Sequence, residues 1–194
     1  MAGTCKIAQV REHGWNGRIV CNEIEPEWAL QGEGLVEIHI GDAAHMDWAQ
    51  DNEFDAIITS PTYGNRMADH HDAKDGSKRY TYKHMLGRDL HPENTGQMQW
   101  GDQYRRKHEE IWKECIRVLK PGGLLVVVVK DHIRNGKRQH VSLWHVATLR
   151  RLGCRYVGRL KVDLPGMRNG ANRELRVDHE DVWVLEKRKE GKSC

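Results

Sequence analysis

The residues with the most distinctive chemistry stand together in one short segment, DAIITSPTYGNRM, at positions 55–67. An apolar run of strand length ends there, and Ser60, Pro61 and Tyr63 follow it directly. In an open α/β sheet, ligands bind at the carboxyl ends of the strands, so residues just after a strand are the first candidates for a site. A hydroxyl, a proline and an aromatic ring at such an end indicate a candidate functional turn.

Two further strand ends carry acidic residues. Glu23, followed by Ile24, closes one predicted strand before Pro26 opens a helix, and Asp42, followed by Ala43, comes just after the next strand. A carboxylate in the first position can accept hydrogen bonds from both ribose hydroxyls of a nucleoside-like cofactor. Asp42 can accept a hydrogen bond from an adenine amino group. Acids at strand ends are also common helix caps, so each alone is weak support.

Strand-like and helix-like patterns alternate along the chain and would position these residues. Such alternation favours parallel strands joined by crossover helices. Apolar faces at helical spacing predict helices, and the glycines after them predict their ends. The run LLVVVV at 124–129 predicts a buried central strand. The predicted strands are 18–24, 35–40, 54–59, 124–129, 154–163 and 181–187, and the predicted helices include 109–119 and 141–153.

Length and the distribution of polar residues predict one domain over residues 1–194. Residues 61–105 interrupt the alternation, because they are rich in Gly, His, Asp, Lys, Arg and Tyr and show no apolar period. Long insertions of this kind usually bind or cover something, so this segment is expected to be functional and to face a ligand.

The formal net charge of +3 hides an uneven distribution of charge. Residues 1–60 hold 3 Lys and Arg against 11 Asp and Glu, whereas residues 130–176 hold 12 against 3. A basic second half suggests a polyanionic partner, with an ordinary solvated surface as the alternative.

Cysteine spacing and hydropathy exclude other classes of protein. The five cysteines form no CxxC pair, which argues against a zinc ribbon or a disulfide scaffold and favours reduced thiols. The segment LLVVVV is the longest apolar run and is far shorter than the roughly 20 residues of a membrane span. The N-terminal residues lack a secretory pattern, so the expected location is cytoplasmic and away from membranes.

The segment at 55–67 resembles the catalytic motif of amino-methylating DNA methyltransferases, written (D/N/S)PP(Y/F). Other parts of the chain match this family in the expected order: Glu23 and Asp42 at its ribose and adenine positions, RVLKPGGLLVVVVKD, and HEDVWVLEK near the C-terminus. The resemblance implies a Rossmann-like class I methyltransferase fold, α/β, mostly parallel with an antiparallel C-terminal strand. It also implies Ser60, Pro61 and Tyr63 as the catalytic residues and S-adenosylmethionine as cofactor. The cofactor contacts that it implies are Gly3, Thr4, Glu23, Ile24, Asp42, Ala43 and Ser60.

The sequence departs from the family in two places. Thr62 stands where the motif has a second proline, which removes a fixed φ angle from the turn. The first cofactor motif is almost absent: Gly3 and Thr4 match its end, but the strand before it has no counterpart. The fold is therefore expected to lack its first strand, which leaves an exposed edge. Three explanations stay open: a start further upstream, a strand supplied by another chain, or an inert relative.

Contacts to double-stranded DNA are expected on the same edge of the sheet. Asn65 and Arg66 follow the motif and are placed near a flipped base. The remaining candidates are basic residues or a histidine in two later segments, for which phosphate contacts are expected: Lys130, His132, Arg134, Lys137, Arg138, Arg168 and Arg173. Trp100 is a candidate DNA-facing aromatic residue.

No metal site is expected, because His70, His71 and Asp72 lie in a polar loop without a second ligand pair. The resemblance implies methyl transfer to an exocyclic amino group of a flipped base. Ser60 at the first motif position resembles the N4-cytosine branch of the family more than the adenine branch, which mildly favours N4 of cytosine over N6 of adenine. The alternatives are an RNA methyltransferase and a truncated, noncatalytic nucleic-acid-binding relative.

Overall fold

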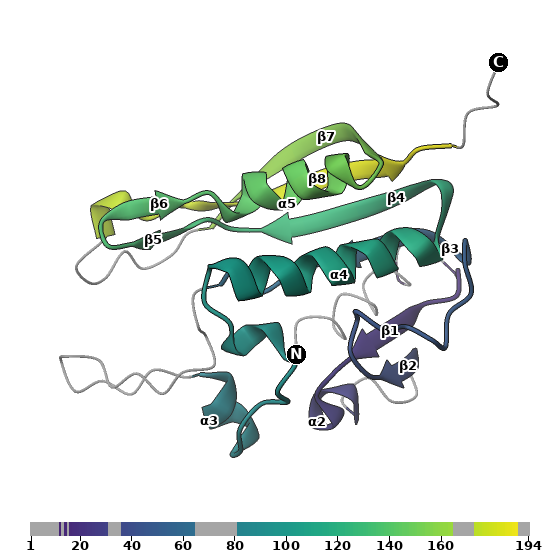
Figure 1. Ribbon diagram of the computed structural model, residues 1–194, viewed down its shortest axis with the longest axis horizontal. Helices are drawn as coiled ribbons and strands as arrows, with labels where there is room; N and C mark the ends of the chain where they lie inside the picture. Colours follow the sequence, from purple (N-terminus) through teal and green to yellow (C-terminus); the bar gives the residue numbers. More distant parts are fainter. Residues whose placement is uncertain are drawn as a thin grey trace.

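A computed structural model describes Glu12, Gly14 and residues 16–30, 36–64, 81–164 and 173–189 (Figure 1). Strands and helices alternate in it, as the apolar patterns predict. The elements, in chain order, are β1 (Val20–Glu23), α2 (Pro26–Ala29), β2 (Glu37–Ile40), β3 (Phe54–Thr59), α3 (Tyr82–Leu86), the 3-10 helix η2 (Thr95–Gln97), α4 (Asp102–Val118), β4 (Leu119–Val129), β5 (His132–Arg134), β6 (Lys137–Gln139), α5 (Val141–Arg151), β7 (Cys154–Asp163), the 3-10 helix η3 (Arg173–Leu175) and β8 (His179–Lys187).

The largest sheet is mixed and has the strand order β3-β4-β8-β7. Strand β3 pairs parallel with β4, whereas β8 lies antiparallel between β4 and β7. The expected antiparallel C-terminal strand is therefore confirmed. Strands β1 and β2 form a separate parallel pair. Within the described residues, neither β1 nor β3 has a strand on its other edge.

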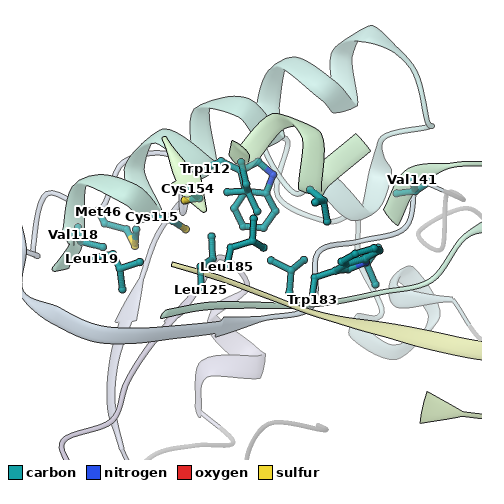
Figure 2. Packing of buried hydrophobic residues seen from close by; sticks show 14 of the residues in the cluster. Met46, Trp112, Cys115, Val118, Leu119, Leu125, Val141, Cys154, Trp183 and Leu185 are labelled. Carbon is teal, nitrogen blue, oxygen red and sulfur yellow. The ribbon is translucent and has the colours of Figure 1, made fainter. Parts of the chain in front are cut away.

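The hydrophobic core lies on one face of the four-stranded sheet (Figure 2). Leu125 and Leu185 of the sheet are fully buried, and Trp112 of α4 packs into the same cluster. Because side chains alternate along a strand, their neighbours point to the opposite face. On that face Ile58 is 75% exposed and Leu160 is 65% exposed.

The apolar run of β4 is therefore half-buried rather than buried on both faces. Leu125, Val127 and Val129 are buried, whereas Leu124 is 39% exposed. The predicted strand is confirmed, and its predicted burial holds for one of its two faces. An unbroken apolar run does not reveal whether one or two layers of the protein will cover the sheet.

Helix α4 begins seven residues before the predicted start, at Asp102 instead of 109. Its buried face includes Tyr104, His108, Trp112 and Cys115, which recur at helical spacing. The histidine and the tyrosine continue the apolar face toward the N-terminus. The PGG turn falls inside β4, where the register with β3 shifts and Gly122 has φ +84°.

The predicted insertion at 61–105 contains regular structure. Helix α3 begins after Thr81, whose side chain accepts from the His84 backbone N–H, and η2 begins after Asn94, whose side chain accepts from the Gly96 N–H. Such caps satisfy helix-end donors and allow short helices in a polar sequence. Residues 65–80 lie outside the described part.

The segment at 130–140, for which no regular structure was predicted, forms the hairpin β5–β6. Asn135 and Gly136 have φ angles of 51° and 68° and connect its strands. An Asn-Gly pair with positive φ angles is the preferred two-residue hairpin turn, so the sequence held a signal for this element. No helix in the described residues is long and apolar enough to cross a membrane.

Candidate functional site

The SPTY turn follows β3, where the sheet register places its residues beside the carboxyl end of β4. Ser60 is exposed, Pro61 is buried and Tyr63 is half-buried. Because β3 and β4 are parallel, their carboxyl ends meet at one edge of the sheet. The Ser60 hydroxyl is therefore exposed at this edge, directly after a strand.

Tyr63 is held in place by the amino end of β8. Its hydroxyl donates to Glu180 Oε1 at 2.7 Å. Burial, together with Glu180, raises the pKa of Tyr63, so the phenol keeps its proton. Sequence reasoning missed Glu180. The usable signal was the antiparallel direction of β8, which brings its start to the edge where parallel strands end.

The remainder of the turn is fixed through backbone atoms. The Thr62 carbonyl accepts a hydrogen bond from Tyr104 Oη, and Thr62 Oγ1 donates to Thr95 Oγ1 at 2.9 Å. The Gly64 carbonyl accepts from the Trp100 backbone N–H at 2.7 Å. Gly64 has φ +64°, and a Cβ there would lie 2.9 Å from the Trp100 nitrogen, so this position requires glycine.

Glu23 lies at the end of β1, half-buried and flanked by Ile24. Its Oε1 accepts from the Glu25 backbone N–H at 3.0 Å. Burial raises the pKa of Glu23. A carboxylate oxygen has two lone pairs, so the group keeps free acceptors, which the predicted contacts to the hydroxyls of a ribose would need.

Asp42 follows β2, beside Ala43, and both of its oxygens already have protein partners. Oδ1 accepts from the Ala44 N–H at 3.0 Å, and Oδ2 is ion-paired with the buried Lys107. Lys107 also binds Glu93 at 2.7 Å. Each Asp42 oxygen keeps one lone pair, so the residue fits an adenine amino group while Lys107 stays in place. Lys107 lies 65 positions further along the chain, and no sequence pattern linked it to Asp42.

Glu25 is fully buried next to this region and was also missed. Its carboxylate accepts from the His91 N–H at 2.8 Å and from Asn94 Nδ2 at 2.7 Å, and it is ion-paired with Arg88 at 2.9 Å. A buried carboxylate requires such partners. Glu25 thereby attaches residues 88–94, part of the predicted insertion, to the end of β1.

The described basic candidates divide into two groups. Arg134 donates to Gln99 Oε1 at 2.8 Å, and Arg138 is ion-paired at 2.7 Å with the buried Asp131. These two residues hold the hairpin in place. Lys130 and Lys137 have no ion pair within the described residues, and Lys137 is exposed. Lys137 is therefore the basic residue of the hairpin best placed for a phosphate.

Two other candidates differ from the expectation. Burial lowers the pKa of His132, which favours a neutral ring over a cationic phosphate contact. Trp100 packs edge-on against Tyr104 and Trp144, with ring centroids 5.3 and 5.6 Å apart. This indole belongs to an aromatic cluster on the core, which does not favour a DNA-facing role.

Several predicted residues lie outside the described part of the chain: Gly3, Thr4, Asn65, Arg66, Arg168, His70, His71 and Asp72. Arg173 begins η3, and its side chain is also outside. Within the described residues, no group of three or more His, Cys, Asp or Glu side chains is arranged to hold a metal ion.

Comparison with known proteins gives one family match. The family described as DNA methylase, of the N6 and N4 type, matches residues 54–193. No curated protein matched the chain.

Solved structures resemble the fold. A candidate DNA modification methylase from Thermus thermophilus is 20% identical with a TM-score of 0.50, covering 80% of this chain and 56% of that one. A SAM-dependent methyltransferase from Methanosarcina mazei is 13% identical with a TM-score of 0.54, covering 89% and 83%. A chain from the complex of a methyltransferase activator with a candidate methyltransferase of Haloferax volcanii is 13% identical with a TM-score of 0.57, covering 95% and 78%. The chain thus has an α/β methyltransferase fold and spans 56% of the Thermus protein.

Proposed function

Because the chain belongs to the N6 and N4 DNA methylase family, we propose that it carries the catalytic turn of an S-adenosylmethionine-dependent DNA methyltransferase. The reaction adds a methyl group to an exocyclic amino nitrogen of a flipped base, N4 of cytosine in preference to N6 of adenine. The main support for this proposal is the position of the SPTY turn at the carboxyl end of β3, where Tyr63 is hydrogen-bonded to Glu180.

The chemistry of the acceptor explains why Ser60 and Pro61 would be needed. An exocyclic amino nitrogen is a poor nucleophile, because its lone pair is delocalised into the ring. Ser60 Oγ and the Pro61 carbonyl would accept its two hydrogens and stabilise the positive charge that develops during attack. Tyr63 would stack on the flipped base. S-adenosylmethionine supplies a sulfonium methyl, and the protein contributes mainly orientation.

Cofactor contacts are assigned to the strand ends of the β1–β2 sheet. Glu23, with Ile24, would hold the ribose, and Asp42, with Ala43, would accept from the adenine amino group. Gly3, Thr4 and Ser60 are the remaining cofactor contacts that the sequence resemblance implies. The open lone pairs on Glu23 and Asp42 support these roles.

Double-stranded DNA is the proposed substrate. Lys130 and Lys137 would contact phosphates, and Arg138 would contribute through the hairpin that it anchors. Asn65, Arg66, Arg168 and Arg173 keep their proposed roles near the flipped base or the backbone.

We also propose that a further strand lies between β1 and β3. Both edges are unpaired among the described residues, and unpaired edges readily accept another strand. A strand in this position would be supplied by an upstream segment or by another chain. Such a strand would also bring the β1–β2 pair and the large sheet into one layer.

The test is methyl transfer from isotope-labelled S-adenosylmethionine to duplex DNA, followed by mass spectrometry of the nucleosides. N4-methylcytosine is the expected product. N6-methyladenine would refute the preferred base, whereas labelling of structured RNA but not DNA would indicate the RNA alternative. DNA binding that weakens with salt, without any transfer, would indicate the noncatalytic alternative.

Two variants separate the assigned roles. Ser60→Ala is expected to lower kcat with little change in cofactor affinity, and Asp42→Ala is expected to weaken cofactor binding first. Cofactor affinity is measured by calorimetry and kcat with saturating cofactor. The reverse pattern would refute both assignments.

A further inference from the structure

A buried chain of hydrogen bonds ends on the turn that carries Ser60 and Pro61. Trp112 Nε1 lies 3.1 Å from His145 Nδ1, and His145 Nε2 lies 3.0 Å from Tyr104 Oη. Tyr104 Oη in turn donates to the Thr62 carbonyl. At most 1% of Trp112, His145 or Tyr104 is exposed. The turn is thus connected to helices α4 and α5 through side chains that solvent does not reach.

The direction of every bond in this chain follows from the donors available. An indole N–H can only donate, so His145 Nδ1 must accept and carries no proton. The neutral imidazole then has its proton on Nε2 and donates to Tyr104 Oη. The single hydroxyl proton of Tyr104 is left for the Thr62 carbonyl. Burial lowers the pKa of His145 and raises that of Tyr104, in agreement with a neutral ring and a protonated phenol.

The hydrogen bond to the Thr62 carbonyl restrains the turn at the position where the sequence lacks a proline. Thr62 lacks the ring that would fix its φ angle, so the peptide after Pro61 needs another constraint. The Thr62–Tyr63 peptide plane, held by Tyr104, directly follows the peptide whose carbonyl belongs to Pro61. Restraining the Thr62–Tyr63 peptide therefore restricts rotation of the Pro61–Thr62 peptide, which carries the Pro61 carbonyl.

We propose that Tyr104 is a positioning residue for methyl transfer: its hydroxyl, oriented by His145 and Trp112, holds the Thr62 peptide and so aims the Pro61 carbonyl at the target amino group. This inference rests on the proposed function of the turn. Tyr104 acts through Thr62 and touches no reacting atom. In this chain it supplies by hydrogen bonding a restraint that a proline at position 62 would supply covalently.

A double-mutant cycle with Tyr104→Phe and Thr62→Pro tests the proposal in the full chain. Tyr104→Phe removes one oxygen and is expected to lower kcat by roughly 10- to 100-fold, with KM for DNA and cofactor affinity within about twofold of the original. In the Thr62→Pro background the same change is expected to cost less than about threefold, because the proline restrains the turn. An equal loss in both backgrounds, or no loss in either, would overturn the proposal.

A matched control separates positioning from general destabilisation. Ser142 is also buried, and its hydroxyl donates to Asp181 and accepts from Trp183 Nε1, at 2.8 and 2.7 Å. Ser142→Ala removes a buried hydroxyl with no bond to the turn. It is expected to lower the unfolding midpoint in urea to a similar degree as Tyr104→Phe, with kcat unchanged. A parallel loss of kcat in Ser142→Ala would mean that stability, and not Tyr104, controls the rate.

A spectroscopic readout keeps the proposal testable if the protein transfers no methyl group. With ¹³C-labelled carbonyl groups, the Thr62 resonance is expected to move upfield in Tyr104→Phe, because it loses a hydrogen bond, and to stay in place in Ser142→Ala. The His145 ring is expected to show a protonated Nε2 and an unprotonated Nδ1. An unshifted Thr62 resonance would refute the positioning bond, whereas a shifted resonance without any methyl transfer would refute only the proposed function.

Discussion

Glu25 illustrates how a single buried carboxylate can organise the region beside the candidate cofactor residues. Its carboxylate holds the His91 backbone, Asn94 and Arg88, three groups that lie 63 to 69 positions later in the chain. The group is fully buried, so each of these bonds replaces a contact with water.

Glu25→Gln is expected to lower the free energy of unfolding by about 2 kcal/mol, because a neutral amide loses the charge-assisted bonds and faces Arg88 with a donor. Urea unfolding measures the change. Glu27→Gln is the matched control, since Glu27 binds the same arginine but is exposed. A smaller loss in Glu25→Gln than in Glu27→Gln would contradict this account.

The buried histidines make stability depend on pH. Burial lowers the pKa of His108 to about 4 and that of His145 well below 6.5. The unfolded chain therefore binds more protons between these values, and stability falls as pH falls from 6.5 toward 4. Titration of His108 alone is expected to lower the free energy of unfolding by about 3 kcal/mol between neutral pH and pH 4.

Urea unfolding at several pH values measures this dependence. His108→Gln is expected to flatten the fall in stability between pH 6.5 and 4, whereas His45→Gln, at an exposed position, is expected to leave it unchanged. Equal slopes for the original chain and His108→Gln would show that His108 does not titrate in this way.

At the residue scale, sequence reasoning located the acids and the turn but not their partners. Ser60 and Asp42 follow strands and Glu23 ends one, positions that local patterns reveal. Glu180 contacts Tyr63 and Lys107 contacts Asp42 from distant parts of the chain, and only the folded topology brings these pairs together.

The hairpin β5–β6 shows how one element can give adjacent cations different roles. Lys137 begins β6 as an exposed cation, and the next residue, Arg138, neutralises the buried Asp131. Alternation along the strand sends these two side chains to opposite faces.

Lys137→Ala is expected to weaken DNA binding uniformly across sequences and to reduce the salt dependence of log K by about 0.9. Arg138→Ala is expected to destabilise the protein, because it leaves Asp131 buried without its cation. Binding titrations at several salt concentrations and urea unfolding distinguish the two. A change in folding stability from Lys137→Ala would contradict the division of roles.

Elements were predicted best where the apolar pattern was strong. Strands β3 and β7 have the predicted bounds, whereas α4 begins earlier, because buried Tyr104 and His108 extend its face. The hairpin was missed although Asn135 and Gly136 signalled its turn. Short helices α3 and η2 rest on single side-chain caps, which give little periodic signal.

At the scale of the whole molecule, side-chain contacts connect the β1–β2 sheet with the part of the protein that contains the four-stranded sheet. Arg18, just before β1, binds Glu53, just before β3, at 2.6 Å, and Asp42 after β2 is ion-paired with Lys107 of α4. Trp48 Nε1 donates to Asn22 Oδ1 at 3.1 Å. Figure 1 shows the β1–β2 pair set apart from β4, β8 and β7. The overall charge and length gave no indication of this division.

Amide hydrogen exchange is expected to differ between the β1–β2 sheet and the four-stranded sheet. Amides of β1 and β2 should exchange by a low-energy partial opening, whereas those of β4 and β8, at the centre of the large sheet, should need global unfolding. Adding S-adenosylmethionine is expected to slow exchange in β1 and β2 selectively. Uniform protection of both sheets without the cofactor would show that they open together.

The division gives the proposed cofactor a second role as a thermodynamic cross-link. The proposed ribose and adenine contacts belong to the half with β1 and β2, whereas Ser60, a proposed catalytic residue and cofactor contact, belongs to the half with the large sheet. A ligand that touches both halves adds its binding energy to their association, by RT ln(1 + [L]/Kd) when it binds only the closed form. The concentration of methyl donor would then set how often the smaller half separates, so supply of the donor would govern the lifetime of the assembled site as well as its turnover.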